Sequence, residues 1–275
     1  MAVAMPESVA QLQAIMRWAN ERRVPIIPQG GNTGLVGGQI PHESGDEIVL
    51  SLKRLDRIRE VDATSNTMTC EAGVVLQTAQ QAAAAADRLF PLSLGADGSC
   101  TIGGNLSSNA GGTGALAYGV ARDPVMGLEV VLADGRVWHG LNKLKKDNTG
   151  YDLKHLFVGA EGTLGVITAA VLKLFPTPRA RETAVLGVPS PQAALAALDL
   201  AQARAGGTIT GFEFMPRIGL EFVLRHAPGS RDPLGRPHAW YVLMELSSVA
   251  GGALRATLEE VLAAGFEDGL IEDAA

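Results

Sequence analysis

The chain has 275 residues, of which 47% are hydrophobic and 19% are charged, and it contains 33 glycines. The net charge is -6 at pH 7 and the pI is about 5.4. This composition is typical of a glycine-rich soluble α/β protein and argues against disorder and against a nucleic-acid or anionic-membrane partner. No apolar run approaches the ~20 residues that a transmembrane helix needs, so we expect no membrane span.

Two cysteines and the N-terminal segment bear on the cellular compartment. Cys70 and Cys100 have no metal-binding spacing, and two buried structural thiols in a reducing compartment are favoured over a disulfide, which stays open. The first 23 residues lack the charged-then-apolar order of a signal peptide, and Glu7 and Glu21 weigh against a transit peptide. We therefore expect a cytoplasmic protein.

Hydrophobic spacing predicts the elements of the first 175 residues. Apolar residues from Val9 to Ala19 recur at helical spacing, and Pro6-Glu7-Ser8 opens that helix. A short strand then leads into a glycine loop, an arrangement that favours parallel strand pairing, and Asp134-Gly135 marks a hairpin turn. The predicted strands are 25–28, 47–52, 67–72, 125–132, 137–141 and a long β-rich run at 166–175, with a second helix at 76–86.

A break at residues 176–179 marks a predicted domain boundary, with one domain at 1–178 and a second at 179–275. Beyond the break, strands and helices alternate as in a sheet with helices on one face. No closing strand is evident at Asp273-Ala274-Ala275. The predicted strands are 184–188, 209–215 and 239–246, the helices are 191–204, 218–225 and 252–264, and a polar loop spans 226–237.

Glycine gathers in three clusters: 30–38, 95–114 and 159–165. Glycine lets the backbone approach a ligand closely, so that successive N–H groups can point at one anion, although a single cluster more often reflects turns and packing. The first cluster has no Gly-Lys-Ser/Thr and no clean dinucleotide fingerprint, which disfavours a P-loop and a nicotinamide site. Three clusters with few charges instead favour a large, flat, partly apolar ligand with a diphosphate, as in FAD.

Five ordered blocks follow one another along the chain: PQGGNTGL (Pro28–Leu35), PLSLGADGSCTIGGNLSSNAGG (Pro91–Gly112), YGVARDPVMGLEVVLADG (Tyr118–Gly135), DNTGYDLKHLF (Asp147–Phe157) and GAEGTLGVIT (Gly159–Thr168). Together they resemble the FAD-binding domain of the vanillyl-alcohol-oxidase (PCMH) type, most closely its D-2-hydroxy acid dehydrogenase branch. That branch includes D-lactate dehydrogenase, the glycolate oxidase flavin subunit and D-2-hydroxyglutarate dehydrogenase. The resemblance implies an α+β fold, with an FAD-binding domain of two α+β subdomains followed by the start of an α+β substrate domain.

The resemblance also implies roles for residues within these blocks, with the first loop at the FAD diphosphate, the second at the ribityl and isoalloxazine portion, and the third at the adenosine side. The implied diphosphate residues are Gly30, Gly31, Asn32, Thr33 and Gly34, beside Pro28 and Leu35. The implied ribityl and isoalloxazine residues are Gly95, Ser99, Gly103, Gly104, Asn109, Gly111 and Gly112, beside Pro91 and Ile102. The implied adenosine residues are Glu161, Gly162 and Ile167.

Asn32 stands where relatives that bind FAD covalently often carry histidine, so we expect a non-covalent, dissociable FAD. Oxidation of a 2-hydroxy acid needs a base for the hydroxyl proton and a cation for the carboxylate. In the resembled branch these groups come from a later, histidine-rich part of the substrate domain. No equivalent is found here, so we expect no metal site and leave the catalytic residues unassigned.

The five histidines are interpreted as surface, structural or loop residues rather than as catalytic or metal-binding ones. His42 is interpreted as a surface residue, and His139 and His155 as structural. His226 and His238 flank a loop with Arg225, Arg231 and Arg236 that could touch an anionic substrate, but a solvated loop is favoured.

Two functions follow. The first is an FAD-dependent oxidoreductase that converts a D-2-hydroxy acid into the 2-oxo acid and passes electrons to a separate acceptor. The alternative is an FAD-binding module or subunit that lacks complete catalytic machinery.

Overall fold

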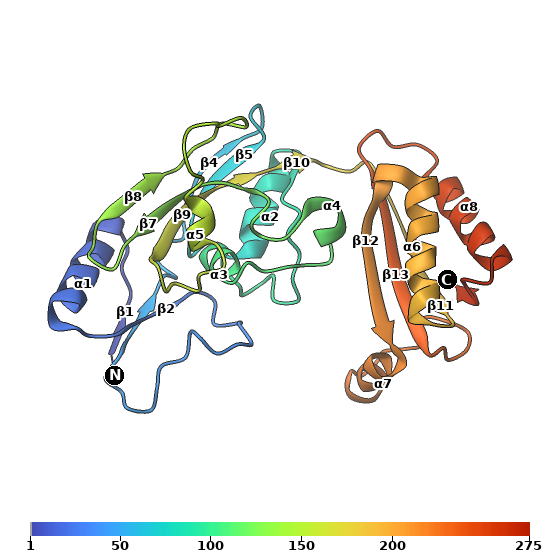
Figure 1. Cartoon of the computed structure of the whole chain (residues 1–275), viewed down its shortest axis with the longest axis horizontal. Coiled ribbons are helices and arrows are strands. Elements are labelled where there is room, and N and C mark those ends of the chain that lie inside the picture. The colour runs from blue at the N-terminus through green and yellow to red at the C-terminus, as the bar shows by residue number, and fades with distance from the viewer. Residues whose placement is uncertain (1) are drawn as a thin grey trace. The chain divides into compact units, whose positions relative to one another are not determined.

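The structure is a computed structural model that describes residues 2–275. The chain divides into two compact units (Figure 1). The first comprises the described residues up to Gly112 together with Gly119–Thr177, and the second comprises Thr113–Tyr118 and Pro178–Ala275. Each unit has its own cluster of buried hydrophobic residues.

The first unit begins with a small parallel sheet of strands β1 (Ala2–Ala4), β3 (Ile48–Ser51) and β2 (Ile26–Gln29), in that order. Helix α1 (Val9–Arg22) connects β1 to β2; the Ser8 hydroxyl accepts a hydrogen bond from the Gln11 amide and so caps its first turn. The parallel orientation predicted from the sequence is confirmed, although β1 and β2 each pair with β3 and not with one another. It places the end of β2, and the glycine loop that follows, at one edge of this sheet.

The second sheet of this unit is antiparallel, with strand order β4-β5-β9-β7-β8. Its central strand β9 is buried over seven of its eight residues, which explains the long apolar run in the sequence. Helices α2 (Leu76–Ala85) and α3 (Ile102–Ser107) pack against it. The strands are β4 (Ile58–Asp62), β5 (Thr67–Glu71), β7 (Val125–Val131), β8 (Val137–Gly140) and β9 (Val166–Lys173).

The glycine-rich stretch at 91–114 is more ordered than its composition suggests. Helix α3 lies within it and buries Ile102 and Leu106 in the core of the first unit. Its end continues into helix α4 (Ala115–Tyr118), which contacts strand β12 and is part of the second unit. Two short elements complete the first unit: the pair β6 (Arg88–Leu89) and β10 (Phe175–Pro176), and helix α5 (Lys154–Phe157).

The second unit is a four-stranded antiparallel sheet with strand order β12-β13-β11-β14. Helices α6 and α8 contact one another and the sheet, and their buried residues join one apolar core with the strands. Ser190 caps α6, and Pro191 occupies its first turn. The elements are β11 (Ala180–Val188), α6 (Pro191–Ala205), 3-10 helix η1 (Gly206–Thr208), β12 (Ile209–Pro216), α7 (Arg217–His226), β13 (Trp240–Ser248), α8 (Leu254–Glu267) and β14 (Asp273–Ala274).

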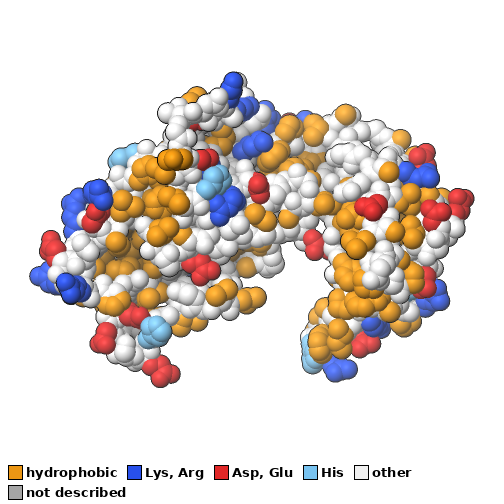
Figure 2. Space-filling view, viewed as in Figure 1, with side chains coloured by type: hydrophobic (Ala, Val, Ile, Leu, Met, Phe, Trp, Pro, Cys, Tyr) orange, Lys and Arg blue, Asp and Glu red, His pale blue; other side chains and the backbone are white. Residues whose placement is uncertain are grey.

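Two features of this unit were not foreseen. The expectation of no closing strand is wrong, because β14 pairs antiparallel with β11 at the edge of the sheet. Helix α7 has no buried residue, and Figure 2 shows hydrophobic side chains gathered over it, among them Ile218, Phe222 and Val223. Within the described residues, no helix is both long and apolar enough to cross a membrane.

Candidate functional site

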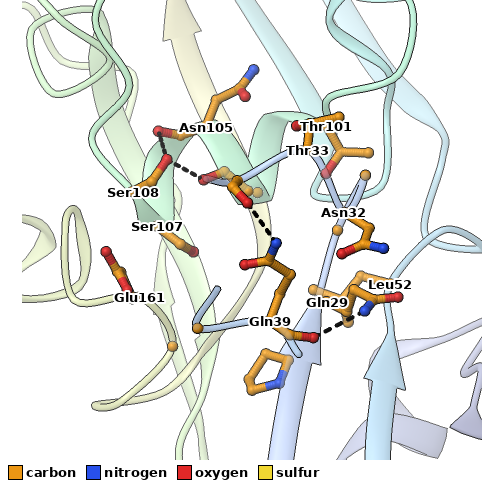
Figure 3. Close-up of a pocket in the computed structure, with 18 of the residues that line it drawn as sticks. Gln29, Asn32, Thr33, Gln39, Leu52, Thr101, Asn105, Ser107, Ser108 and Glu161 are labelled. Carbon is orange, nitrogen blue, oxygen red and sulfur yellow. Dashed lines mark hydrogen bonds between the residues drawn. The ribbon is translucent and has the colours of Figure 1, made fainter. Parts of the chain in front are cut away.

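A pocket lies in the first unit where three segments meet: the loop after β2, the start and end of α3, and the turn before β9 (Figure 3). These are the three glycine clusters of the sequence, brought together by the two sheets. Only Glu161 among the lining residues is ionisable. The lining residues are Pro28, Gln29, Gly30, Gly31, Asn32, Thr33, Gly34, Val36, Gly38, Gln39, Leu52, Thr101, Gly103, Gly104, Asn105, Ser107, Ser108, Glu161, Gly162, Val166 and Ile167.

Close packing of the first loop explains two of its glycines. A Cβ atom on Gly31 would lie 2.1 Å from the carbonyl oxygen of Ser99, and one on Gly30 would lie 2.4 Å from the Thr101 hydroxyl oxygen. Both positions therefore require glycine because the loop packs directly against the segment that leads into α3. These two glycines allow one side of the loop to pack against the protein, while the loop also lines the pocket.

Three residues with side chains hold the left-handed backbone conformation in the predicted site. The φ angles are 60° at Asn32, 49° at Asn109 and 50° at Glu161. Asparagine enters this region readily, whereas glutamate does so at a cost of the order of 1 kcal/mol or more. The Glu161 amide donates to the Ser107 carbonyl at 2.9 Å, a bond that helps to hold this conformation. Such outliers cluster at ligand sites, so they support a functional role for these turns.

The pocket presents hydrogen-bond donors that the protein does not use. Among the described residues, the backbone amides of residues 31–34 donate to no other protein group. The Thr101 hydroxyl is buried and has no hydrogen-bond partner, and it is the N-cap residue of α3 without capping it. Buried polar groups are nearly always satisfied, so an unsatisfied one in a pocket is a candidate ligand contact. Unused amides beside an unused hydroxyl, with little charge, suit the oxygens of a diphosphate.

The pocket unites many, but not all, of the residues that the sequence suggested. Those that line it are Pro28, Gly30, Gly31, Asn32, Thr33, Gly34, Gly103, Gly104, Glu161, Gly162 and Ile167. Ile102 packs in the core, Leu35 is fully exposed, and Pro91, Gly95, Ser99, Asn109, Gly111 and Gly112 do not line it. Thr101, Ser107, Ser108 and the pair Gln29 and Gln39 were missed, although the hydroxyl residues stand inside the glycine-rich stretch and could have been found there.

None of the five histidines lines this pocket. The interpretation of His238 as part of a solvated loop is wrong: the residue is 4% exposed, with its ring nitrogens 3.0 Å from Glu272 and 3.3 Å from Asp273. The intervening residues fold the C-terminal segment back onto this ring, which no sequence spacing reveals. Within residues 2–275, no cluster of three His, Cys, Asp or Glu side chains is arranged to hold a metal ion.

The cysteines are also inert. Both are free and buried in the first unit, as the sequence indicated. Burial raises the pKa of the Cys70 thiol to about 12, which keeps it protonated at neutral pH.

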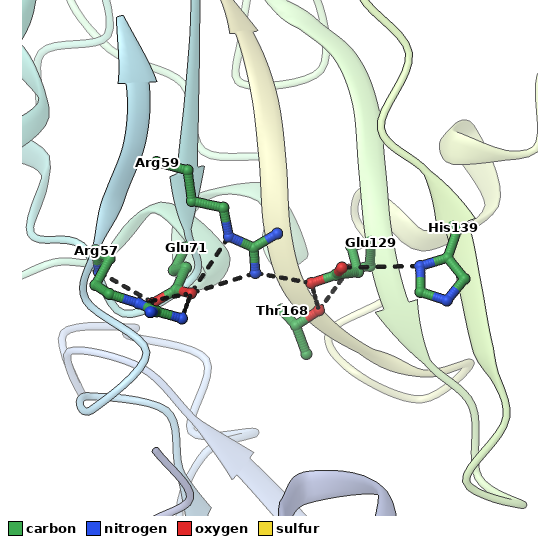
Figure 4. Close-up of polar contacts among 6 residues, drawn as sticks. All are labelled: Arg57, Arg59, Glu71, Glu129, His139 and Thr168. Carbon is green, nitrogen blue, oxygen red and sulfur yellow. Dashed lines mark hydrogen bonds and ion pairs between the residues drawn. The ribbon is translucent and has the colours of Figure 1, made fainter. Parts of the chain in front are cut away.

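A second polar cluster crosses the five-stranded sheet of the first unit (Figure 4). Arg59 on β4 lies 3.3 Å from Glu71 on β5 and 3.0 Å from Glu129 on β7, so its guanidinium spans the intervening strand β9. Thr168 on β9 donates to Glu129 at 2.9 Å, and Arg57 lies 2.9 Å from Glu71. Both carboxylates are buried and each has several partners. The cluster is therefore fully satisfied, in contrast to the pocket.

The fold and pocket define a two-unit α+β protein with a pocket lined largely by glycine and small polar residues. A family model described as "FAD binding domain" matches residues 1–140, and one described as "FAD linked oxidases, C-terminal domain" matches residues 177–275. Because the first match covers more than half of the chain, the protein belongs to the FAD-binding-domain family. The predicted FAD cofactor and α+β fold class are thereby confirmed.

The chain is also similar to two curated proteins and to one solved structure. The chain is 41% identical over 270 residues to the probable mitochondrial D-2-hydroxyglutarate dehydrogenase of Oryza sativa subsp. indica, covering 98% of this chain and 48% of the relative. It is 45% identical over 221 residues to the mitochondrial D-2-hydroxyglutarate dehydrogenase of Danio rerio, covering 80% and 41%. The fold matches p-cresol methylhydroxylase with a TM-score of 0.76 at 18% identity, covering 99% of this chain and 57% of that structure.

These comparisons have two further consequences. The chain spans about half the length of the curated relatives that it matches. The expectation of a cytoplasmic location is wrong, since both relatives are named as mitochondrial proteins.

Proposed function

We propose that the pocket of the first unit binds FAD non-covalently, with the cofactor's diphosphate against the first glycine loop. The observation that carries this proposal is the set of unused donors: the amides of residues 31–34 and the buried hydroxyl of Thr101. Asn32 has no group that could form the covalent bond expected of histidine at this position, so the flavin dissociates on denaturation.

The remaining assignments follow the order of the three segments along the pocket. Glu161, Gly162 and Ile167 take the adenosine side, where a carboxylate can accept a hydrogen bond from a ribose hydroxyl without facing the diphosphate. Gly103 and Gly104 are assigned to the ribityl and isoalloxazine portion. The resemblance adds residues that lie outside the pocket lining: Gly95, Ser99, Asn109, Gly111 and Gly112. Residues 1–178 thus act as the FAD-binding domain, and residues 179–275 as part of a substrate domain.

The reaction that this site serves is the oxidation of a D-2-hydroxy acid to the 2-oxo acid. The identity with two D-2-hydroxyglutarate dehydrogenases supports this, and it favours D-2-hydroxyglutarate over D-lactate as substrate. FAD, when bound, supplies the acceptor for the hydride that leaves the α-carbon, and a separate acceptor then removes the electrons. The contribution of this chain is to bind and orient the cofactor through the first loop and α3.

A second candidate function is an FAD-binding portion without full catalytic machinery. No histidine lines the pocket, and the ring of His238 is already held by Glu272 and Asp273, so it is not free to act as the base. Arg236, one of the cations considered for the substrate carboxylate, lies 3.8 Å from Glu272. Positioned proton transfer contributes ~10²–10⁴-fold to a rate, so its absence would leave cofactor binding with little turnover.

One experiment tests both functions. Purified protein is loaded with FAD, and the bound flavin is measured by absorbance and by release into the supernatant after acid precipitation. Loaded protein is then mixed anaerobically with D-2-hydroxyglutarate, D-lactate or glycolate, and flavin bleaching is followed. Failure to bind FAD, or colour that stays with the precipitate, contradicts the cofactor proposal. Rapid bleaching by residues 1–275 supports the full oxidoreductase, whereas bound but unbleached FAD supports the second function.

A further inference from the structure

Two glutamines that line the pocket form a chain of hydrogen bonds with the glycine loop. Gln29, the last residue of β2, donates from Nε2 to the main-chain carbonyl of Gln39 at 3.0 Å. Gln39 in turn donates from its own Nε2 to the carbonyl of Gly34 at 2.8 Å. Figure 3 shows both bonds, with the Gln39 side chain reaching across the inside of the loop. The chain ties the strand, the far end of the loop and its middle to one another.

Beyond Gly30 and Gly31, which pack against the segment before α3, the loop has few other tertiary restraints. Leu35 is fully exposed and Val36 is 84% exposed, so the apolar residues at its tip pack against nothing. The turn at its far end is closed by the Ile40 amide, which donates to the Gly37 carbonyl at 3.0 Å, but this bond does not reach the middle of the loop. Gly34 itself fits closely against the side-chain amide of Gln39, because a Cβ atom there would lie 3.2 Å from Oε1.

We infer that Gln39, supported by Gln29, is a positioning residue that fixes the FAD-binding loop before the cofactor arrives. This inference rests on the proposed binding of FAD in this pocket. By holding the Gly34 carbonyl on the inner side of the loop, the bond orients the adjoining peptide units. These units belong to the stretch of residues 31–34, which lines the pocket and whose amides are unused. A loop already fixed in this way loses less conformational freedom when it binds a ligand, and the affinity is correspondingly higher.

The test removes the donor and keeps the size of the side chain. Gln39→Met retains an unbranched chain of similar length but cannot donate to Gly34. We expect the Kd for FAD, measured by quenching of flavin fluorescence, to rise about tenfold, the upper range for one lost hydrogen bond. In FAD-free protein, the amides of residues 33–38 should exchange with deuterium faster than in the wild type. Gln29→Met should act in the same direction, and the double variant should bind FAD about as weakly as Gln39→Met, because both bonds belong to one chain.

Gln13→Met is the matched control. Gln13 on α1 also donates from Nε2 to a glycine carbonyl, that of Gly135, at 2.9 Å, but far from the pocket. It should leave both FAD affinity and loop exchange unchanged.

The outcomes separate this inference from the proposal on which it rests. A Gln39→Met protein with wild-type loop exchange and a Kd within twofold of the wild type would overturn the role of Gln39. Additive losses in the double variant would overturn the single chain of bonds. If the wild-type protein takes up no FAD, the proposed function fails, and the deuterium exchange of the ligand-free loop still decides whether Gln39 holds it.

Discussion

The first unit has two regions with buried polar groups, the cluster on the five-stranded sheet and the pocket, and they differ in whether those groups have hydrogen-bond partners. In the cluster on the five-stranded sheet, Glu71 and Glu129 are buried, and each carboxylate meets an arginine and further donors. In the pocket, the Thr101 hydroxyl is equally buried and has no hydrogen-bond partner, and the amides of residues 31–34 are unused within the described residues. The polar groups of the sheet cluster are satisfied within the protein, whereas those of the pocket are not.

This difference separates groups that stabilise the fold from groups that await a ligand. A buried carboxylate without partners would be strongly unfavourable, so the sheet must supply arginines at the right strands. An unused hydroxyl costs less, and binding recovers that cost. The comparison predicts that variants of the sheet cluster lower stability and spare FAD binding, and that variants of the pocket lower FAD affinity.

The largest effect is expected from Gly31→Ala. The new Cβ would lie 2.1 Å from the Ser99 carbonyl oxygen, so the loop must move away from the segment before α3, and its amides move with it. Overpacking of this kind lowers the free energy of unfolding by about 1–3 kcal/mol. Because the loop amides are displaced as well, we expect FAD affinity to fall about 100-fold. Fluorescence titration with FAD measures this.

Gly95→Ala serves as the control, since a Cβ there meets no atom within 4 Å. The resemblance places Gly95 near the isoalloxazine, yet the free protein has room for the methyl group. We expect a change of less than about threefold, because no contact within the protein is disturbed. Equal losses in the two alanine variants would show that ligand contact, rather than packing of the loop, requires both glycines.

The next effect is on stability. Arg59→Met removes the guanidinium that lies between Glu71 and Glu129 and leaves both carboxylates with fewer partners. Breaking a buried pair costs about 3–5 kcal/mol; since Arg59 is partly exposed and Arg57 remains beside Glu71, we expect about 2–3 kcal/mol from urea unfolding. FAD affinity should stay unchanged. Arg54→Met, which breaks an exposed pair with Glu7, should cost less than about 1 kcal/mol.

A smaller effect is expected on the free energy of unfolding at acidic pH. Burial alone would raise the pKa of Glu71, but hydrogen bonds and charge from Arg57, with the charge of Arg59, outweigh burial and hold this pKa below its usual value. A lowered pKa stabilises the folded state above the unfolded pKa of about 4.3 and loses that contribution as the pH falls through the folded pKa. The free energy of unfolding should therefore decline below about pH 4.5. Glu71→Gln should show a shallower decline, and an identical pH profile would contradict this assignment.

The sequence could predict the pocket in outline because glycine clusters follow strands, and the ends of strands converge in a sheet. It could not predict which glycines pack against protein, since the contact between Gly31 and Ser99 joins segments far apart in the chain. The wrong predictions for His238 and for the closing strand also involve contacts between residues far apart in the chain. The burial of His238 depends on Glu272 and Asp273, and β14 is too short to have a periodicity. The sequence also gave no indication of the ion pairs of Arg59, because its partners lie on two other strands.

The smallest expected effect is also the most direct test of the comparison. Thr101→Val replaces the unused hydroxyl with a methyl group of the same shape. Because the hydroxyl has no partner in the free protein, its removal should leave stability unchanged or raise it slightly. FAD affinity should fall about 3- to 10-fold, the range of one neutral hydrogen bond, and Thr101→Ser should retain most of it.

Thr69→Val is the matched control for this change. Thr69 on β5 also has a buried, unpartnered hydroxyl, but it does not line the pocket. Its replacement should be equally neutral or favourable for stability and should have no effect on FAD affinity. If Thr101→Val binds FAD as tightly as the wild type, or if Thr69→Val weakens binding to the same extent, the hydroxyl of Thr101 is unsatisfied for structural reasons alone. The contrast between the two regions would then rest only on the amides of the glycine loop.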